Sequence, residues 1–244
     1  NVLELKGFYS TFEEAESYAS GYGESRIVDT VGEAVIKLLE GKARYERDGT
    51  CFDEVPGDLK IVNVFKKIYT EDCTVVDFGG GLGGTFLLLS DILSKDSCYT
   101  IIEQHKYVIK GEELRHRYNL RVKFISKIEE VQAMPSIVIA SGVLQYLKNP
   151  YQILGEIAML NSKYIILDRL AYGDSNSHNE QIYHLQNCKS NFGRGSLVPF
   201  QLISWGKLVE ILAIYNYKAV DSWKNDFDPC IPKHAGFLFE QNPT

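Results

Sequence analysis

The sequence predicts an α/β fold, in which a seven-stranded, mostly parallel sheet carries helices on both faces and includes an antiparallel C-terminal strand. From Thr74 onward, short β-branched runs alternate with helical stretches, a pattern typical of a parallel sheet covered by helices. The last two apolar runs are separated by a proline-containing loop, and we expect them to pair antiparallel. The residues before Thr74 lack this alternation. We therefore expect an N-terminal helical cap, or lid, at residues 1–69 and the α/β domain at residues 70–244.

The N-terminal region carries three helix signals. Ser10 and Thr11 are followed three residues later by Glu13 and Glu14, which predicts a capping box in either of two registers at the start of a first helix. A second helix is predicted by apolar residues at i, i+3, i+4, i+7 and i+8, namely Val31, Ala34, Val35, Leu38 and Leu39. Gly41 can end that helix, and Asp58 can cap a third one over residues 59–69.

The remaining elements follow in order along the chain. Strands are expected at Thr74–Phe78, Cys98–Glu103, Val122–Ser126, Ser136–Ala140, Tyr164–Asp168, Tyr217–Trp223 and Ala235–Glu240. Helices are expected at 85–93, 106–118 and 150–160, and from Ser204 onward. The polar segment at residues 171–203 is too long for an ordinary connection, so we expect it to form a substrate-binding insertion or lid.

Composition excludes several classes of protein. The net charge of −6 argues against nucleic acid as the main partner, because phosphate backbones are bound by clustered Lys and Arg. No apolar run approaches the roughly 18 residues needed to span a bilayer, and the acidic start does not read as a basic leader. The five cysteines form no CxxC pair, so we expect neither a disulfide framework nor a metal site. A reduced cytoplasm fits this pattern best.

The stretch VVDFGGGLGGTF contains five glycines directly after the first predicted parallel strand: Gly79, Gly80, Gly81, Gly83 and Gly84. Glycines here permit a tight turn and let a ligand approach the backbone closely. Their spacing satisfies two patterns at once. One is the dinucleotide fingerprint GxGxxG, which starts at Gly79, and the other is DxGxGxG, which starts at Asp77 and marks enzymes that use S-adenosylmethionine (SAM). The stretch therefore predicts a cofactor site without choosing the cofactor.

Two carboxylates narrow the choice. Asp77 at the strand end would repel the pyrophosphate of a dinucleotide, whereas it favours the sulfonium and ammonium cations of SAM. Asp77 can also be a plain turn residue or helix cap. Glu103 ends the next strand, where a carboxylate can bind both hydroxyls of a ribose, a contact that either cofactor would use.

The motifs together resemble a known superfamily. VVDFGGGLGG, the strand that ends at Glu103, and IVIASGVLQYLKNP are similar to the first, second and fourth motifs of class I SAM-dependent methyltransferases. The resemblance implies a Rossmann-like fold, SAM as methyl donor and S-adenosylhomocysteine (SAH) as product. The strings GFYSTFEEAE, YERDGTCFDE, SGVLQYLKNP and LDRL also resemble a bacterial family of methyltransferases often encoded among surface-polysaccharide genes.

The resemblance also suggests which residues hold SAM. By analogy with methyltransferases whose N-terminal helices cover the cofactor, Tyr45 or Arg47 is expected to reach the SAM carboxylate. Backbone contacts are expected from Ser141 and Gly142. Gln145 and Tyr146 occupy the usual position for groups that face the transferred methyl, and the helical spacing of their leucine neighbours also allows Tyr146 a place in the core. Many relatives carry an aspartate after the third strand that reads the adenine amino group. This chain has FISKIEEV there, so Ser126 or a backbone group would take that role.

Residues for the acceptor are expected beyond the fifth strand, at the edge where open α/β sheets bind ligands. Our hypothesis is that Asp168 and Arg169 face the acceptor, with His178, Tyr183 and His184 on a covering loop. His184, His178 or Asp168 can serve as general base, and Arg169 can bind an anionic group such as a sugar-linked phosphate. Two histidines in a polar loop can equally be solvated.

The sequence thus favours SAM-dependent methylation of an oxygen on a saccharide, sugar-nucleotide or other small polar metabolite. The substrate class rests on the family resemblance. Two alternatives stay open: an NAD(P)-dependent oxidoreductase or epimerase, and a SAM-binding partner protein without turnover.

Overall fold

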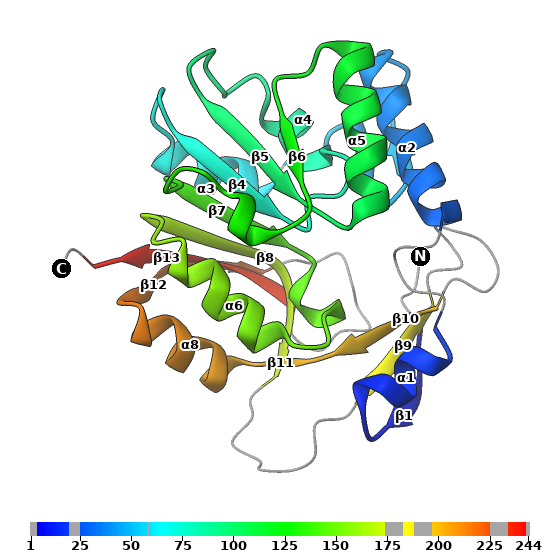
Figure 1. Cartoon of the computed structure of the whole chain (residues 1–244), viewed down its shortest axis with the longest axis vertical. Coiled ribbons are helices and arrows are strands. Elements are labelled where there is room, and N and C mark those ends of the chain that lie inside the picture. The colour runs from blue at the N-terminus through cyan, green and yellow to red at the C-terminus, as the bar shows by residue number, and fades with distance from the viewer. Residues whose placement is uncertain are drawn as a thin grey trace. The chain divides into compact units, whose positions relative to one another are not determined.

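The computed structural model describes residues 4–19, 25–57, 59–173, 183–187, 197–224 and 234–242 (Figure 1). The chain divides into two compact units, one formed by residues 23–139 and the other by residues 1–22 together with 140–244. The sequence-based boundary between residues 69 and 70 stays a prediction. The fold is α/β, with a mostly parallel central sheet and an antiparallel C-terminal strand.

The unit of residues 23–139 contains the parallel strands. Strand β4 (Thr74–Phe78) pairs on one side with β5 (Cys98–Ile102) and on the other with β7 (Ile137–Ser141), whose last two residues belong to the other unit. β6 (Lys123–Ile125) pairs with β5. Val75, Val76 and Asp77 in the middle of β4 are all buried, as expected for a parallel strand that is covered on both faces.

The four α-helices that the structure describes in this unit lie where the sequence predicted helices, although the one expected at 85–93 ends at Leu89. They are α2 (Ser25–Leu39), α3 (Lys60–Ile68), α4 (Gly84–Leu89) and α5 (His105–Tyr118), with the 3₁₀ turn η1 at Ile128–Glu130. Gly41 ends α2 as predicted: its φ is +70°, and the paired bonds Gly41 N–H to Leu38 O and Lys42 N–H to Lys37 O form a Schellman motif. Asp58, the expected cap of α3, lies outside the described residues.

A β-hairpin replaces part of the helical region expected before residue 70. β2 (Tyr45–Arg47) pairs antiparallel with β3 (Thr50–Phe52). Asp48 and Gly49 between them have φ of +50° and +79°, the conformation of a type I′ turn. An Asp-Gly pair between two short strands is a strong hairpin signal. This hairpin between α2 and α3 was not among the elements expected in the N-terminal cap.

The second unit contains the antiparallel pairs of the central sheet. β13 (His234–Gln241) pairs antiparallel with both β8 (Tyr164–Gly173) and β12 (Tyr217–Lys224), which confirms the antiparallel C-terminal pair. α6 (Pro150–Met159) and α8 (Trp205–Ile214) agree with prediction, and the Ser204 hydroxyl caps α8 by accepting from Lys207 N–H at 3.3 Å. The two-residue strand β11 (Ile203–Ser204) pairs parallel to β8, so the described sheet strands number eight instead of seven.

A small separate sheet in this unit was not expected. β9 (Tyr183–Asn187) lies between β1 (Glu4–Tyr9) and β10 (Leu197–Gln201), both antiparallel to it. Residues 183–187 and 197–201 of the expected insertion, and residues 4–9 before the first helix, are therefore strands. The helix itself is confirmed: α1 (Phe12–Ser17) begins at a capping box in which Thr11 Oγ1 accepts from Glu14 N–H and Ser10 N–H donates to the Glu14 carboxylate.

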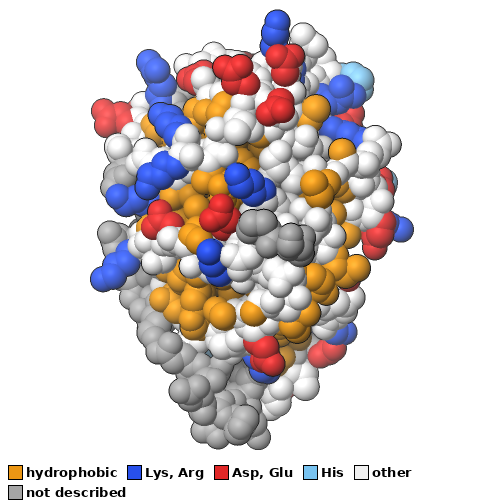
Figure 2. Space-filling model, turned by 90° about the vertical axis from the view of Figure 1, so that its left-hand side faces the viewer, with side chains coloured by type: hydrophobic (Ala, Val, Ile, Leu, Met, Phe, Trp, Pro, Cys, Tyr) orange, Lys and Arg blue, Asp and Glu red, His pale blue; other side chains and the backbone are white. Residues whose placement is uncertain are grey.

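The surface in Figure 2 shows basic and acidic side chains interspersed, with apolar patches between them. Over the described residues, no helix is long and apolar enough to cross a membrane. Within the same residues, no group of three or more His, Cys, Asp or Glu side chains is placed to hold a metal ion.

Candidate functional site

The glycine loop follows β4 in the unit of residues 23–139. Gly79, Gly81 and Gly83 have φ of +71°, +58° and +94°, a region that side-chain-bearing residues rarely adopt. Gly83 is the N-cap residue of α4. These glycines are thus required by the backbone path itself, which turns sharply from the strand into the helix.

Gly80 is required for a different reason. A Cβ at this position would lie 2.5 Å from Oδ2 of Asp77, so the loop closes directly onto the aspartate carboxylate. Asp77 is 1% exposed and accepts a hydrogen bond from the Tyr99 hydroxyl at 2.8 Å. Burial, and then the charge of Asp77, raise the pKa of Tyr99 well above its usual value, so Tyr99 stays a donor. Asp77 therefore supports the loop from below.

Glu103 lies at the carboxyl end of β5, as predicted, and contacts the same loop. Its Oε1 accepts from Gly81 N–H at 3.2 Å, and its Oε2 accepts from Gln104 N–H at 2.7 Å. Burial raises the pKa of Glu103 despite these two bonds. A carboxylate oriented by two backbone donors keeps further lone pairs for a ribose hydroxyl.

The hairpin adds a carboxylate that the sequence did not single out. Glu46 Oε2 lies so close to Gly84 that a Cβ there would be 2.6 Å from it, while Oε1 accepts from Gly49 N–H at 3.0 Å. Burial raises the pKa of Tyr107, and the charges of Glu103, Asp48 and Glu46 raise it further. The surroundings of the glycine loop are therefore acidic, which suits a cationic ligand better than a phosphate.

The other predicted cofactor residues have defined neighbours. Tyr45 packs against Phe52 across the hairpin, with ring centroids 5.7 Å apart, and Arg47 Nε lies 3.7 Å from Asp48 Oδ2. The hydroxyl and the N–H of Ser126 both donate to Glu130 Oε1, at 3.0 and 3.2 Å. Their contacts to a cofactor stay predictions.

In the second unit, Asp168 and Arg169 form a β-bulge in β8. Leu167 pairs with Phe237 and Leu170 with Ala235, so two residues of β8 lie opposite Gly236 alone. Arg169 has a φ of +49°, an uncommon value for a long side chain. The sequence placed these residues at the strand's end. The strand instead continues to Gly173, because β13 and β11 pair with its second half.

Asp168 is held by donors on both carboxylate oxygens. Trp223 Nε1 donates to Oδ1 at 2.9 Å, and Ser141 Oγ donates to Oδ2 at 3.1 Å. Gly142 N–H donates to the backbone carbonyl of Asp168 at 2.9 Å. Asp168 is 6% exposed, so this carboxylate is a buried, well-satisfied anchor.

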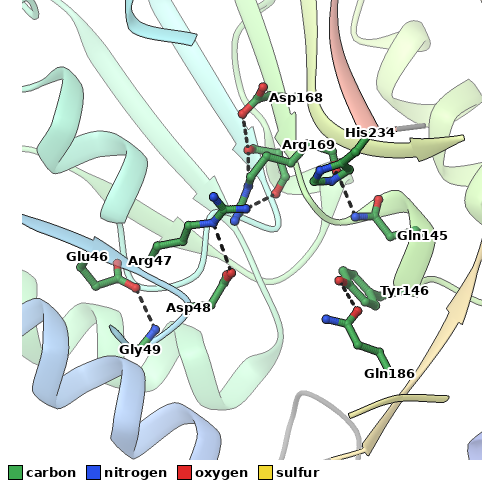
Figure 3. A network of polar contacts seen from close by, with 11 residues as sticks. Glu46, Arg47, Asp48, Gly49, Gln145, Tyr146, Asp168, Arg169, Gln186 and His234 are labelled. Carbon is green, nitrogen blue, oxygen red and sulfur yellow. Dashed lines mark hydrogen bonds and ion pairs between the residues drawn. The ribbon is translucent and has the colours of Figure 1, made fainter. Parts of the chain in front are cut away.

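Arg169 is fixed from several sides (Figure 3). Its Nε donates to Ser141 Oγ at 3.2 Å, and a Cβ at Gly142 would lie 3.0 Å from its Nη2, so the guanidinium lies over that glycine. Its backbone carbonyl accepts from Gln145 Nε2 at 3.0 Å and contacts His234 Nε2 at 2.8 Å. The predicted residues Ser141, Gly142 and Gln145 therefore surround the bulge.

Of the three residues expected on a covering loop, the structure describes Tyr183 and His184. His178 lies outside the described residues. Tyr183 and His184 lie on strand β9 and not on a loop. His184 Nδ1 is 2.9 Å from the Gly7 carbonyl oxygen, and its ring contacts Phe8. Burial raises the pKa of Tyr183.

Tyr146 of the string SGVLQYLKNP, which resembles the fourth methyltransferase motif, contacts the small sheet. The Tyr146 hydroxyl donates to Gln186 Oε1 at 2.6 Å, and the Tyr146 ring packs against Phe200 of β10 (Figure 3). Tyr146 belongs to the short 3₁₀ turn η2 (Leu144–Tyr146) that follows β7. The fourth-motif string VLQYL thus supplies both Gln145 to the bulge and Tyr146 to the small sheet.

Comparison with known proteins identifies the fold. No family model matches the sequence, and no curated protein matches it either. Solved structures do. The 1,6-didemethyltoxoflavin-N1-methyltransferase of Burkholderia thailandensis, solved with its substrate and SAH, has a TM-score of 0.55 and 13% identity over 99% of this chain and 95% of that one. This is the fold of SAM-dependent methyltransferases.

Two further structures share that fold. The N-terminal domain of EvdMO1, solved in the presence of SAH and D-fucose, has a TM-score of 0.53 and 13% identity, and the match covers 93% of this chain and 99% of that one. The mitomycin 7-O-methyltransferase MmcR has a TM-score of 0.50 and 16% identity over 76% of this chain. The match spans 54% of the length of MmcR, about half of it.

Four residues with defined roles were missed by sequence reasoning: Glu46, Trp223, His234 and Gly236. For Glu46, the Asp-Gly pair could have indicated the hairpin. Because side chains alternate along a strand, the hairpin would then have placed Glu46 on a different face from the residues next to it. The other three depend on the pairing of β12 and β13 with each other and of β13 with β8. No local pattern reports that register.

Proposed function

We propose that this protein is a SAM-dependent methyltransferase that methylates an oxygen of a saccharide, a sugar-nucleotide or another small polar metabolite. The observation that carries the proposal is the glycine loop with the Asp77, Glu103 and Glu46 carboxylates against it. Such a loop accepts a ligand at close range while its charge disfavours phosphate. The fold shared with SAM-dependent methyltransferases supports the same conclusion.

The residues present fit this cofactor. Glu103 would accept the ribose hydroxyls, since it is already oriented by two backbone N–H donors. Asp77 and Glu46 would favour the cationic methionine end, with Tyr45 or Arg47 on the adjoining hairpin strand for its carboxylate. Bound SAM supplies an electrophilic methyl group on a sulfonium sulfur.

For the acceptor, we assign Arg169 to binding and Asp168 to positioning. Both carboxylate oxygens of Asp168 accept hydrogen bonds, so taking a proton would weaken the contact with Trp223 or Ser141. Asp168 is therefore better suited to hold the bulge that presents Arg169. The Arg169 guanidinium can bind an anionic group of the acceptor.

We assign the general base to His184. Its Nδ1 faces the Gly7 carbonyl oxygen at 2.9 Å, which places the proton of the neutral ring on Nδ1 and leaves Nε2 as the basic nitrogen. Such a nitrogen can accept the proton of a hydroxyl acceptor. Tyr183 and His178 complete the proposed acceptor side, and its sugar preference is supported by the D-fucose present with the EvdMO1 neighbour.

The first test measures cofactor binding. Thermal unfolding is followed with SAM, SAH and NAD side by side, and a ligand at 100 times its Kd should add about 2.7 kcal/mol of stability. We expect stabilisation by SAM and SAH and none by NAD. Folded protein that responds to neither adenosyl ligand would refute the proposal, and a response to NAD alone would indicate an oxidoreductase.

The second test separates an enzyme from a SAM-binding partner. Transfer of radiolabelled methyl from SAM is assayed against a panel of sugars and nucleotide sugars with parent protein, His184→Ala and Arg169→Ala. We expect turnover in the parent, loss of kcat without loss of SAH affinity in His184→Ala, and a raised acceptor KM in Arg169→Ala. Unchanged rates in both variants would refute the assigned roles.

We further propose that the protein acts in a reducing cytoplasm, because its cysteines form no CxxC pair and no disulfide framework is expected from them.

A further inference from the structure

We propose that Glu46 selects the cofactor class by excluding ligands that bring a phosphate to Gly84. The inference rests on the proposed function, because it names the selectivity of the same glycine loop. Glu46 lies outside the glycine pattern, which fits both SAM and dinucleotides. The hairpin that carries Glu46 would therefore choose between these two cofactors.

One oxygen of the Glu46 carboxylate is held by a hydrogen bond, and the other lies beside Gly84. Oε1 accepts from Gly49 N–H at 3.0 Å, and Oε2 occupies the space that any side chain at residue 84 would need, 2.6 Å from the place of its Cβ. Gly84 therefore makes room for a carboxylate. In the dinucleotide fingerprint, the third glycine serves close packing of the helix on the strand instead.

The backbone of the hairpin holds this side chain in place. β2 and β3 pair residue by residue, with Glu46 opposite Cys51. The turn between them has the two positive φ values of a type I′ turn, at Asp48 and Gly49, which matches the twist of short antiparallel strands. Glu46 thus points to the loop because of strand register.

The charge at this point discriminates between ligands. In dinucleotide-binding enzymes the pyrophosphate lies beside the glycines at the start of the helix. Here that place adjoins the Glu46 carboxylate, and like charges a few ångströms apart in a partly buried site repel strongly. SAM brings no phosphate, and its ammonium and sulfonium groups are attracted by the same carboxylate.

Asp77 is less suited to make this choice. It is 1% exposed, lies against Gly80 and accepts a hydrogen bond from the Tyr99 hydroxyl. Glu103 contacts Gly81, on the ribose side of the loop. Among the carboxylates for which the structure gives a contact with this loop, Glu46 is the one placed at Gly84, where a pyrophosphate would lie.

The test compares parent protein, Glu46→Gln and Glu54→Gln by isothermal titration with ADP, NAD and SAH. Glutamine retains an oxygen that can accept from Gly49 N–H, so the hairpin is preserved, and circular dichroism verifies the fold. Glu54 is exposed in the segment after β3 and controls for the loss of one negative charge elsewhere. We expect Glu46→Gln to bind ADP and NAD at least roughly tenfold more tightly than the parent does. Glu54→Gln should behave like the parent.

Each outcome decides one of the two proposals. If Glu46→Gln gains no more ADP affinity than Glu54→Gln, the selectivity inference is overturned, whatever SAH does. If the parent binds no SAH but Glu46→Gln gains ADP affinity, the proposed function fails while the role of Glu46 stands. A parent protein that binds NAD as tightly as Glu46→Gln overturns the inference as well.

Discussion

Replacing Trp223 by phenylalanine should destabilise the protein by removing a donor to a buried carboxylate. Trp223 Nε1 donates to Asp168 Oδ1 at 2.9 Å, and both residues are less than a tenth exposed. A hydrogen bond to a charged group contributes about 1.5–3 kcal/mol, and the buried oxygen would be left with one donor fewer. For a chain of this size, that loss corresponds to a decrease in Tm of roughly 3–12 °C.

Trp205 provides the matched control, because it is the other of the two tryptophans in the chain. Its ring packs against Phe237 with centroids 4.4 Å apart, in an aromatic cluster that a phenylalanine can still join. Chemical denaturation of parent, Trp223→Phe and Trp205→Phe at one pH gives the three free energies of unfolding. If Trp223→Phe loses no more stability than Trp205→Phe, the hydrogen bond does not hold the bulge as we infer.

The same contact can be tested from β13. A Cβ at Gly236 would collide with the Trp223 indole, so Gly236→Ala should push the indole away from Asp168. Both single variants then break the same hydrogen bond, between Trp223 and Asp168. The double variant Trp223→Phe/Gly236→Ala should therefore lose clearly less stability than the sum of the two single losses. Additive losses would show that the two residues act independently.

Three further predictions concern the unit of residues 23–139. Gly80→Ala should reduce SAH affinity at least roughly tenfold, since its Cβ would lie 2.5 Å from a buried carboxylate oxygen; Gly57→Ala, with no atom within 4 Å of its Cβ, is the titration control. Burial raises the pKa of Glu103 in the folded protein. Its contribution to stability is therefore full below the ordinary carboxyl pKa of 4.5 and is lost as pH rises through the folded-state pKa. In Glu103→Gln, the free energy of unfolding measured across pH should decrease less over this range, and SAH binding should be weaker. Iodoacetamide should label the exposed Cys98 well before Cys73, whose thiol pKa burial raises, and equal rates in peptide mass spectra would contradict the packing.

The parallel half of the fold was predictable because its signals are local. Strand β4 has the predicted bounds, and α5 and α6 lie within one residue of theirs. Capping at Thr11 and chain reversal at Gly41 each depend on residues within one or two turns. The small sheet of β1, β9 and β10 was missed because each strand finds its partner far along the chain.

For the site, residue types and spacing predicted where a ligand approaches the backbone. The structure gives Gly79, Gly81 and Gly83 a positive φ, while the approach of a ligand stays a prediction. Asp77 and Glu103 were expected to face a ligand, and both contact the loop, Asp77 from beneath. Their binding roles stay predictions. His178 lies outside the described residues, and Tyr183 and His184 proved to be strand residues, which hydrophobic alternation over such a polar segment could not indicate.

The sequence alone determined the α/β order of elements and the glycine loop, because a backbone that needs positive φ after a buried strand can be written only with glycine or a few polar residues. Tertiary structure decided which charges meet that loop. Hairpin register turns Glu46 toward Gly84, and strand pairing sets Gly236 opposite the Asp168–Arg169 bulge, where Trp223 reaches the buried carboxylate. A one-residue shift in either register would turn these side chains to the opposite face, so no local pattern could have assigned them.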